Sequence, residues 1–249
     1  MLRRALFAVA LVLLLVLNGR SPLHGRPSHL PRLTLWAWER PERLGFLQTP
    51  DVGVAYLAAT INLEEQPRLR PRFQPLLVNP ETPLTAVVRL ELTRATPSSL
   101  TPEYAAEVTR DIVSSVDLER LSGVQIDFDA LRSQREFYRT VLTGVRQQLP
   151  RGKLSITALG SWCLGDDWIS GLPIDDAVPM LFRMGMDHDN IVDALKAGKD
   201  FREPLCRSSI GISTDEPWPE TLLDRNIYVF NPHPWDATTL NAVERKLAP

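Results

Sequence analysis

The sequence lacks the residue patterns that build tightly held metal or nucleotide sites. Its four histidines are scattered along the chain without any metal-ligand spacing. It also contains no glycine-rich loop of the kind that cradles a phosphate group. We therefore expect neither a metal ion nor a bound cofactor.

The chain also lacks an excess of basic residues. Its formal net charge is -2, and residues 1–20 hold three arginines and no acidic residue, so the remainder carries 25 basic and 30 acidic side chains. Proteins that bind nucleic acids generally present a basic surface to the phosphate backbone. We therefore expect no nucleic-acid partner.

No apolar run is long enough for a comfortable membrane span. The longest extends from Ala5 to Leu17, follows two arginines and ends at Asn18, which is the pattern of an export signal. No small-x-small cleavage site follows, so an uncleaved anchor in the inner membrane is the alternative. The sequence predicts an exported protein, periplasmic or extracellular, with residues 1–20 as signal or anchor, 21–32 as a linker and 33–249 as one domain.

Only two cysteines are present, Cys163 and Cys206. An exported protein occupies a compartment in which a disulfide can form and persist. The spacing alone does not distinguish a disulfide from two separate buried thiols.

Eight apolar runs alternate with helix patterns along the chain. Because parallel strands need crossover connections, this alternation predicts a compact (β/α)8 TIM barrel with some helices short or missing, and a doubly wound open sheet is the alternative. The segment 63–83 shows no convincing helix. Expected strands are 33–38, 53–62, 84–92, 123–129, 153–161, 177–185, 209–214 and 226–231; expected helices are 102–116, 190–197, one opened by a capping box at Ser133 and Glu136, and one capped by Asp236.

The run GVQIDFDA, residues 123–130, alternates apolar and polar side chains. Alternate residues of a barrel strand point to the lumen and to the surrounding helices. We therefore expect Gln125, Asp127 and Asp129 to face the lumen, with Asp129 nearest the carboxyl ends of the strands, which we call the mouth. Barrel enzymes place their active sites at this end.

Other predicted strands also carry polar residues at their lumen-facing positions. These side chains are expected to surround the barrel axis at the mouth, where arginines would balance the acidic groups. A polar network that merely fills the lumen is the structural alternative. On strand 53–62, Tyr56 is expected to share the lumen face with Thr60 and Asn62. The expected mouth residues are Asn62, Arg89, Glu91, Asp127, Asp129, Ser161, Arg183 and Asp215.

All six tryptophans lie at the end of a predicted strand or follow one, and are therefore expected near the mouth. An aromatic face can stack on the apolar face of a sugar ring. Some of these rings are expected to cap the core instead. They are Trp36, Trp38, Trp162, Trp168, Trp218 and Trp235.

The same strand resembles a motif of the chitinase-like glycoside hydrolases of family eighteen. In that family the fourth barrel strand carries DGxDxDxE, which ends in a catalytic Glu. Gly123 matches the glycine and Asp127 matches the last aspartate, whereas Ser122 and Gln125 stand in place of the other two aspartates. Asp129 occupies the position of the catalytic acid and is shorter than Glu by one methylene.

A broader resemblance covers most of the chain after its N-terminal segment. LWAWERPERL, VAYLAATINL, GVQIDFDA, VPMLFRMG, GISTDEP and YVFNPHPW together resemble a family of exported bacterial proteins known only as a domain of unknown function. The resemblance implies a glycosidase-like TIM barrel and leaves the reaction open.

Two functions follow as hypotheses. The first is a glycoside hydrolase that acts on an envelope or extracellular polysaccharide or oligosaccharide. Asp129 would be its general acid, because the neighbouring carboxylate is expected to raise the pKa of Asp129, and Asp127 would orient it. Glu91, Asp215 or Glu39 would supply a second carboxylate. The second is a degenerate barrel that binds a polysaccharide or a protein without catalysis. Expected binding residues are Trp36, Trp38, Glu39, Asn62, Arg89, Trp162, Arg183 and Trp235.

Overall fold

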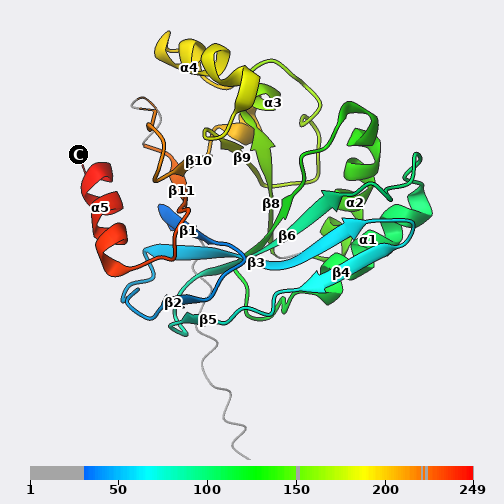
Figure 1. Ribbon diagram of the computed structural model, residues 1–249. Coiled ribbons are helices and arrows are strands. Elements are labelled where there is room, and N and C mark those ends of the chain that lie inside the picture. Colours follow the sequence, from blue (N-terminus) through cyan, green and yellow to red (C-terminus); the bar gives the residue numbers. More distant parts are fainter. Residues whose placement is uncertain (1–30, 150–151, 220, 222–223, 249) are drawn as a thin grey trace, which may run out of the picture.

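The computed structural model describes residues 31–149, 152–219, 221 and 224–248 (Figure 1). The predicted signal or anchor, 1–20, and residues 21–30 of the predicted linker lie outside the described residues. Within the described ranges, no helix combines the length and the apolar character that crossing a membrane requires.

Eight parallel strands close into a barrel. β1 pairs with β11 on one side and with β3 on the other, so the sheet has no free edge among these eight strands. The predicted TIM barrel is thus confirmed, and the open doubly wound sheet is wrong. In barrel order the strands are β1 (Leu33–Ala37), β3 (Val52–Leu63), β6 (Leu84–Leu92), β7 (Gly123–Asp127), β8 (Lys153–Leu159), β9 (Asp176–Met180), β10 (Ser209–Ser213) and β11 (Asn226–Phe230).

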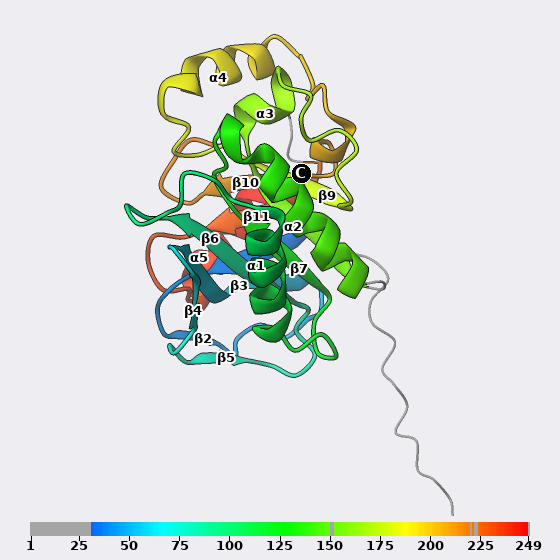
Figure 2. The ribbon, with the colours of Figure 1, turned by 90° about the vertical axis from the view of Figure 1, so that its right-hand side faces the viewer.

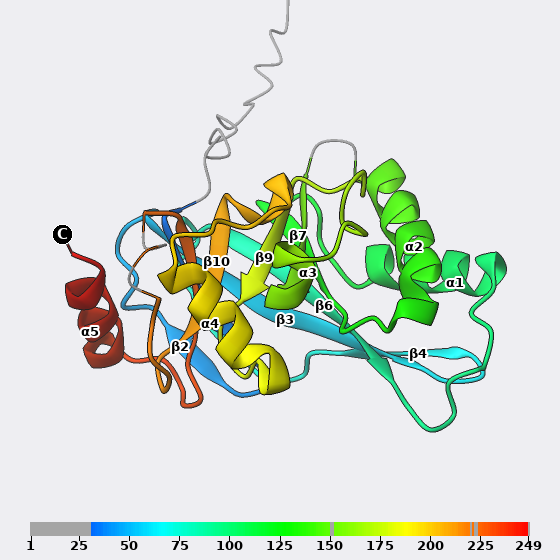
Figure 3. The same ribbon diagram turned by 90° about the horizontal axis from the view of Figure 1, so that it is seen from above.

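Helices cover the barrel unevenly. Helices α1 and α2 pack side by side over the β6 and β7 side, and α5 lies at the opposite end of the molecule (Figures 2 and 3). The β1–β3 and β3–β6 connections carry short strands instead of helices, as the missing helix pattern predicted. The helices are α1 (Pro102–Ser114), α2 (Arg135–Gln148), α3 (Gly160–Leu164), α4 (His188–Lys196) and α5 (Ala237–Leu247); the extra strands are β2 (Glu42–Leu44), β4 (Pro67–Pro71) and β5 (Leu76–Val78).

Polar caps fix the starts of two helices as predicted. The Thr101 side chain accepts the Tyr104 backbone N–H, and Asp236 accepts the Thr239 N–H at 2.7 Å. The capping box predicted at Ser133 is wrong. A 3-10 turn, Arg132–Gln134, precedes α2, and the Gln134 side chain accepts the Leu131 N–H instead.

The strand alternation divides the core into two layers. Outward side chains form the large layer between barrel and helices, which includes Ile126 and Phe128. Inward side chains form a small aromatic cluster in the lumen around Trp36 and Tyr228. The Trp36 indole N–H donates to Gln125 Oε1 at 2.9 Å, and this bond across the lumen explains why an apolar strand carries Gln125.

One lumen position is glycine because the Trp36 ring fills the space beside it. A Cβ at Gly211 would lie 2.7 Å from Trp36 Cη2, closer than carbon atoms approach. The ring therefore fills the middle of the barrel, and a ligand has room only at the ends of the lumen.

A bulge in β3 changes the predicted facing of one residue. The register with β6 shifts between Leu57 and Ala59, so Leu57 pairs with lumen-facing Val87 while Tyr56 pairs with outward Ala86. The expectation that Tyr56 shares the lumen face is therefore wrong.

A disulfide joins Cys163 in α3 to Cys206, with a Cα–Cα distance of 5.8 Å. Both residues are fully buried in the outer core layer. The Arg202 N–H also donates to the Cys163 carbonyl at 2.9 Å. The bridge thereby holds α3 against the chain that returns from α4 to β10.

Candidate functional site: the mouth of the barrel

Two aspartates leave β7 at the mouth, as predicted. Asp127 is the last residue of the strand and its side chain is 14% exposed, whereas Asp129 is exposed. Residues two apart on an extended chain are separated by roughly 6.5–7 Å at the backbone. One carboxyl is therefore set behind the other on the path from lumen to solvent.

Asp127 is held by two neighbouring strands. The Thr157 hydroxyl on β8 donates to Asp127 Oδ1 at 2.6 Å, and Arg89 Nε on β6 lies 3.8 Å from Asp127 Oδ2. The registers of β6 and β7 with their neighbours bring these residues to one level of the barrel. Sequence alternation predicted Arg89 on the lumen face, and it is there beside Asp127.

The electrostatics of Asp127 favour its protonated form. Burial is the main reason that its pKa is raised, and the negative charges of Asp129 and Glu91 act in the same direction. The hydrogen bond from Thr157 and the charge of Arg89 oppose this effect. A mostly buried carboxyl with a raised pKa therefore lies directly behind an exposed one.

Asp129 borders a small cavity at the mouth. The cavity has a volume of about 230 Å³, and its wall combines carboxyl, hydroxyl, guanidinium and apolar groups. This mixture suits a ligand with both hydroxyls and apolar faces, and a few fixed polar groups give such a site its specificity. The lining residues that carry this mixture are Asp129, Leu159, Ser161, Met180, Phe182 and Arg183.

Arg183 and Asp215 form a second charged pair at the mouth. Arg183 Nη2 lies 3.6 Å from Asp215 Oδ2, and both side chains are about half exposed. The Ser213 hydroxyl donates to the same carboxylate, and this bond is the main reason that the pKa of Asp215 is lowered, with Arg183 acting in the same direction. Asp215 therefore favours the ionised form, opposite to Asp127.

The backbone at Arg183 is strained. Its φ of 51° is left-handed, a conformation that favours glycine, and Glu216 accepts its N–H at 3.1 Å. The strand predicted at 177–185 is therefore too long, because β9 ends at Met180 and the chain turns here. The turn lets the Arg183 guanidinium lie 4.9 Å above the Phe230 ring.

Two phenylalanines that sequence reasoning missed form an aromatic platform at the mouth. The rings of Phe182 and Phe230 stack with centroids 5.7 Å apart and an angle of 5° between planes, and both are half-buried. Trp38, also half-buried, packs against the same lumen cluster. The alternation Val178, Met180, Phe182 in the lumen phase is the sequence signal that could have indicated this platform.

Most of the tryptophans do not present a face at the mouth. Trp162 is 5% exposed and packs edge-on against Trp168 in the outer core layer. Trp235 is buried, and its indole N–H donates to the Trp36 carbonyl at 2.9 Å. Trp218 lies under the Lys246 ammonium at 4.0 Å. As expected for some of the six rings, Trp162, Trp168 and Trp235 pack into the core instead.

Three further predicted residues lie on the β3 and β6 side. Asn62 pairs in register with Glu91, so both side chains share the lumen face. Glu91 Oε1 lies 3.8 Å from Arg89 Nη2, whereas the buried Asn62 Oδ1 has no hydrogen-bond partner among the described residues. This acceptor therefore lacks the hydrogen bond that buried polar atoms normally make.

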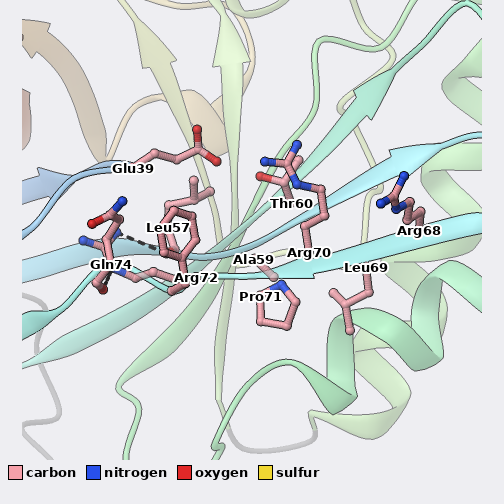
Figure 4. Close-up of a pocket in the computed structure, with 11 residues that line it drawn as sticks. Glu39, Leu57, Ala59, Thr60, Arg68, Leu69, Arg70, Pro71, Arg72 and Gln74 are labelled. Atoms are coloured by element: carbon pink, nitrogen blue, oxygen red, sulfur yellow. Dashed lines mark hydrogen bonds between the residues drawn. The ribbon is translucent and has the colours of Figure 1, made fainter.

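Glu39 lies apart from the Asp129 cavity. It borders a groove of about 550 Å³ beside the mouth, together with Thr60 on β3 and residues of β4 (Figure 4). The Arg72 guanidinium in this groove donates to the carbonyls of Trp38 and Arg40, each at 2.5 Å, and so fixes the chain after β1. Glu39 thus contributes to a neighbouring surface.

No cluster of three or more His, Cys, Asp or Glu side chains within the described ranges could hold a metal ion. The described mouth acids are instead placed next to arginines or hydroxyl groups, as at Asp127 and Asp215.

Comparisons with known proteins give a distant likeness. No family model matches the sequence. No curated protein matches it either. Among solved structures, a fungal endo-β-N-acetylglucosaminidase from glycosyl hydrolase family 18 aligns over 86% of this chain and 84% of its own, with 12% identity and a TM-score of 0.42. The resemblance to an exported bacterial family stays a prediction, and the barrel itself is established by its strand pairing.

Proposed function

We propose that the mouth binds a glycan and hydrolyses it, with Asp129 as the carboxyl that reaches the substrate. The observation that carries this proposal is the pair at the end of β7: an exposed carboxyl lining a cavity, and behind it a mostly buried carboxyl held by Thr157 and Arg89. Glycosidases use paired carboxyl groups around the scissile bond.

In this proposal, Asp129 donates a proton to the leaving glycosidic oxygen as general acid. Donation leaves a negative charge on Asp129. Asp127 lies behind Asp129, where its carboxyl accepts the Thr157 hydroxyl and lies 3.8 Å from Arg89 Nε. Asp127 is therefore a positioning residue, held in place by Thr157.

Asp215 is the preferred second carboxylate. Its lowered pKa keeps it ionised at neutral pH, as a nucleophile or a general base must be. Glu91 is the alternative, because it is also at the mouth but is paired with Arg89. A separation of about 5–5.5 Å between the two carboxyl groups would give retention at the anomeric carbon, and about 6.5–9.5 Å would give inversion.

The ring of Phe182, which lines the cavity and is backed by the stacked ring of Phe230, supplies the stacking surface for a sugar ring. Flat apolar faces stack on the C–H faces of sugars, and the Ser161 hydroxyl at the cavity can bond the ring hydroxyls. We also propose that the protein is exported, since its disulfide is of the kind that persists in oxidising compartments.

The test is hydrolysis of a glycan panel by the full-length chain, with products identified by mass spectrometry. The Asp129→Asn variant keeps the size of the side chain and removes its proton, so we expect at least a hundredfold loss of turnover with glycan binding retained. Asp51→Asn, an exposed change at the opposite end of the barrel, is the matched control and should leave turnover unchanged.

An Asp129→Asn variant that hydrolyses glycans at the parental rate would reject this assignment. A second function, glycan binding without hydrolysis, is favoured by one observation: Glu91 and Asp215 are already paired with arginines. Equal binding by the parent and by Asp129→Asn, with no cleavage of any glycan by either, would establish this second function.

A further inference from the structure

β4 extends the barrel sheet beyond the mouth. It pairs antiparallel with the C-terminal half of β3, so Arg70 lies opposite Thr60 and Arg68 lies opposite Asn62. On the other side of β3, Thr60 pairs with Arg89. Because directly paired residues share a face of the sheet, the β4 arginines continue the polar face that starts at the mouth.

Side-chain directions in the groove agree with this register. Arg68 and Arg70 point to the same side as Thr60, whereas Leu69 and Pro71 point to the other side (Figure 4). Both arginines are exposed. The groove beside the mouth therefore has two guanidinium groups along one wall.

These two guanidinium groups differ from the other arginines nearby in their partners. Arg89 lies 3.8 Å from both Glu91 and Asp127, and Arg72 is bonded to backbone carbonyls. Within the described residues, no acidic group lies within ion-pair distance of Arg68 or Arg70.

Other acids do border this surface, at larger separations. Glu39 lies across the groove from Arg70, and Glu64 and Glu65 border an adjoining hollow with Arg68. None of these three glutamates forms an ion pair with Arg68 or Arg70, so both guanidinium groups remain able to bind a ligand anion.

The groove also offers an aromatic surface. Phe73, two residues after the end of β4, is 84% exposed, an unusual degree for a large apolar side chain. A groove that contains an aromatic ring and two guanidinium groups matches a chain of sugar rings that carry acidic substituents, because the rings stack and the anions pair.

We propose that this groove is a binding subsite for the carboxylates of an anionic polysaccharide, such as a chain of uronic acids. The subsite deepens the proposed function and rests on it for its position, because a glycan bound at the mouth would continue along β4. A nucleic acid is disfavoured, since acidic residues exceed basic ones in the chain and the carboxyl groups of the mouth would face its phosphates.

The probe is a hexamer of galacturonic acid, and its fully methyl-esterified form is the matched neutral ligand. Binding is measured by calorimetry on the full chain at low and moderate salt. We expect the acid to bind at least tenfold more tightly than the ester, and the difference to shrink as salt screens the charges.

The variants separate this subsite from catalysis. Arg70→Gln and the double change Arg68→Gln with Arg70→Gln should remove the preference for the acid form. Arg120→Gln, an exposed change in the loop after α1, is the control and should keep the preference. Circular dichroism of each variant checks that the fold is intact.

Three outcomes decide between the two proposals. Acid-selective binding that depends on Arg70 and survives in Asp129→Asn supports the subsite, whether or not any glycan is cleaved. Equal binding of acid and ester by a chain that hydrolyses neutral glycans overturns the subsite and leaves the proposed function standing. Tighter binding to a single-stranded oligonucleotide than to the uronate hexamer also overturns it.

Discussion

Two aspartates on the lumen face, the mostly buried Asp127 and the fully buried Asp176, can be compared because their neighbours differ. Asp176 starts β9 at the N-terminal end of the barrel and is fully buried. Lys153 Nζ lies 3.2 Å from its Oδ2, and the Ser209 hydroxyl donates to the same oxygen at 2.6 Å. Burial is the main reason that its pKa is raised, as it is for Asp127.

The neighbours of the two carboxyl groups differ in kind. Asp176 has a lysine to itself, whereas Asp127 shares Arg89 with Glu91 and has a third carboxyl, Asp129, in front of it. The ion pair of Asp176 with Lys153 closes the N-terminal end of the barrel. At the mouth, by contrast, the acidic groups outnumber the arginine and border a cavity. This arrangement suits the binding of a ligand or the transfer of a proton.

The largest loss of stability is expected on removing the Cys163–Cys206 disulfide, which lies in the outer core layer behind the mouth. Cys163 lies in α3, whose residue Ser161 lines the cavity. The loop between the two cysteines spans 43 residues, for which the chain-entropy model gives about 4 kcal/mol of stabilisation. We expect Cys163→Ala with Cys206→Ala to lose about this amount in urea unfolding. Unchanged stability in the reduced parent would contradict the prediction.

The second largest loss of stability is expected at Asp176, at the N-terminal end of the lumen. Asp176→Ala leaves Lys153 without its partner and Ser209 without its acceptor, so we expect a loss of about 3 kcal/mol in unfolding free energy. Asp127→Asn keeps the shape and an acceptor for Thr157, and should cost less than about 1 kcal/mol. Equal losses at both positions would break the comparison between the two ends.

The pH dependence of stability gives a smaller effect. Because folding raises the pKa of Asp127 above its ordinary 3.8, this group stabilises the fold most when protonated, at a pH below 3.8. That contribution is lost as the pH rises through the raised pKa. Relative to the parent, Asp127→Asn should gain stability between acidic and neutral pH. Denaturation at several pH values measures this, and parallel curves would refute it.

The smallest effect concerns the strained turn at Arg183. Since its φ of 51° suits glycine, Arg183→Gly should be more stable than Arg183→Ala by about 1 kcal/mol. Both variants lose the half-exposed pair with Asp215, so this loss cancels between them. Thermal unfolding compares the two directly, and an Ala variant as stable as the Gly variant would show that the turn carries no strain.

The sequence was sufficient for the barrel because period-two alternation is a strong signal. It located all eight barrel strands and placed Gln125, Asp127 and Arg89 on the lumen face. It missed β4, since the prolines at both of its ends argue against a strand. Here β4 is an edge strand paired only with β3, a position that tolerates proline.

The site was predicted only in part, because side-chain packing and strand pairing in the folded protein are not visible in the local sequence pattern. Tryptophans were placed at the mouth because they follow strands, yet Trp162 and Trp235 turn into the core or bond to backbone. The bulge that turns Tyr56 outward leaves no mark in the local pattern. Phe182 and Phe230 become neighbours only when β9 and β11 close around β10.

The contact between Trp36 and Gly211 links two positions that are far apart in the chain. Any side chain at 211 collides with the indole ring, and any smaller ring at 36 opens a cavity beside the glycine. Neither residue can change alone without cost, whereas a smaller ring paired with alanine could restore the fit. Over evolutionary time the two positions should therefore vary together, and a library that randomises both at once should yield folded proteins that single substitutions do not.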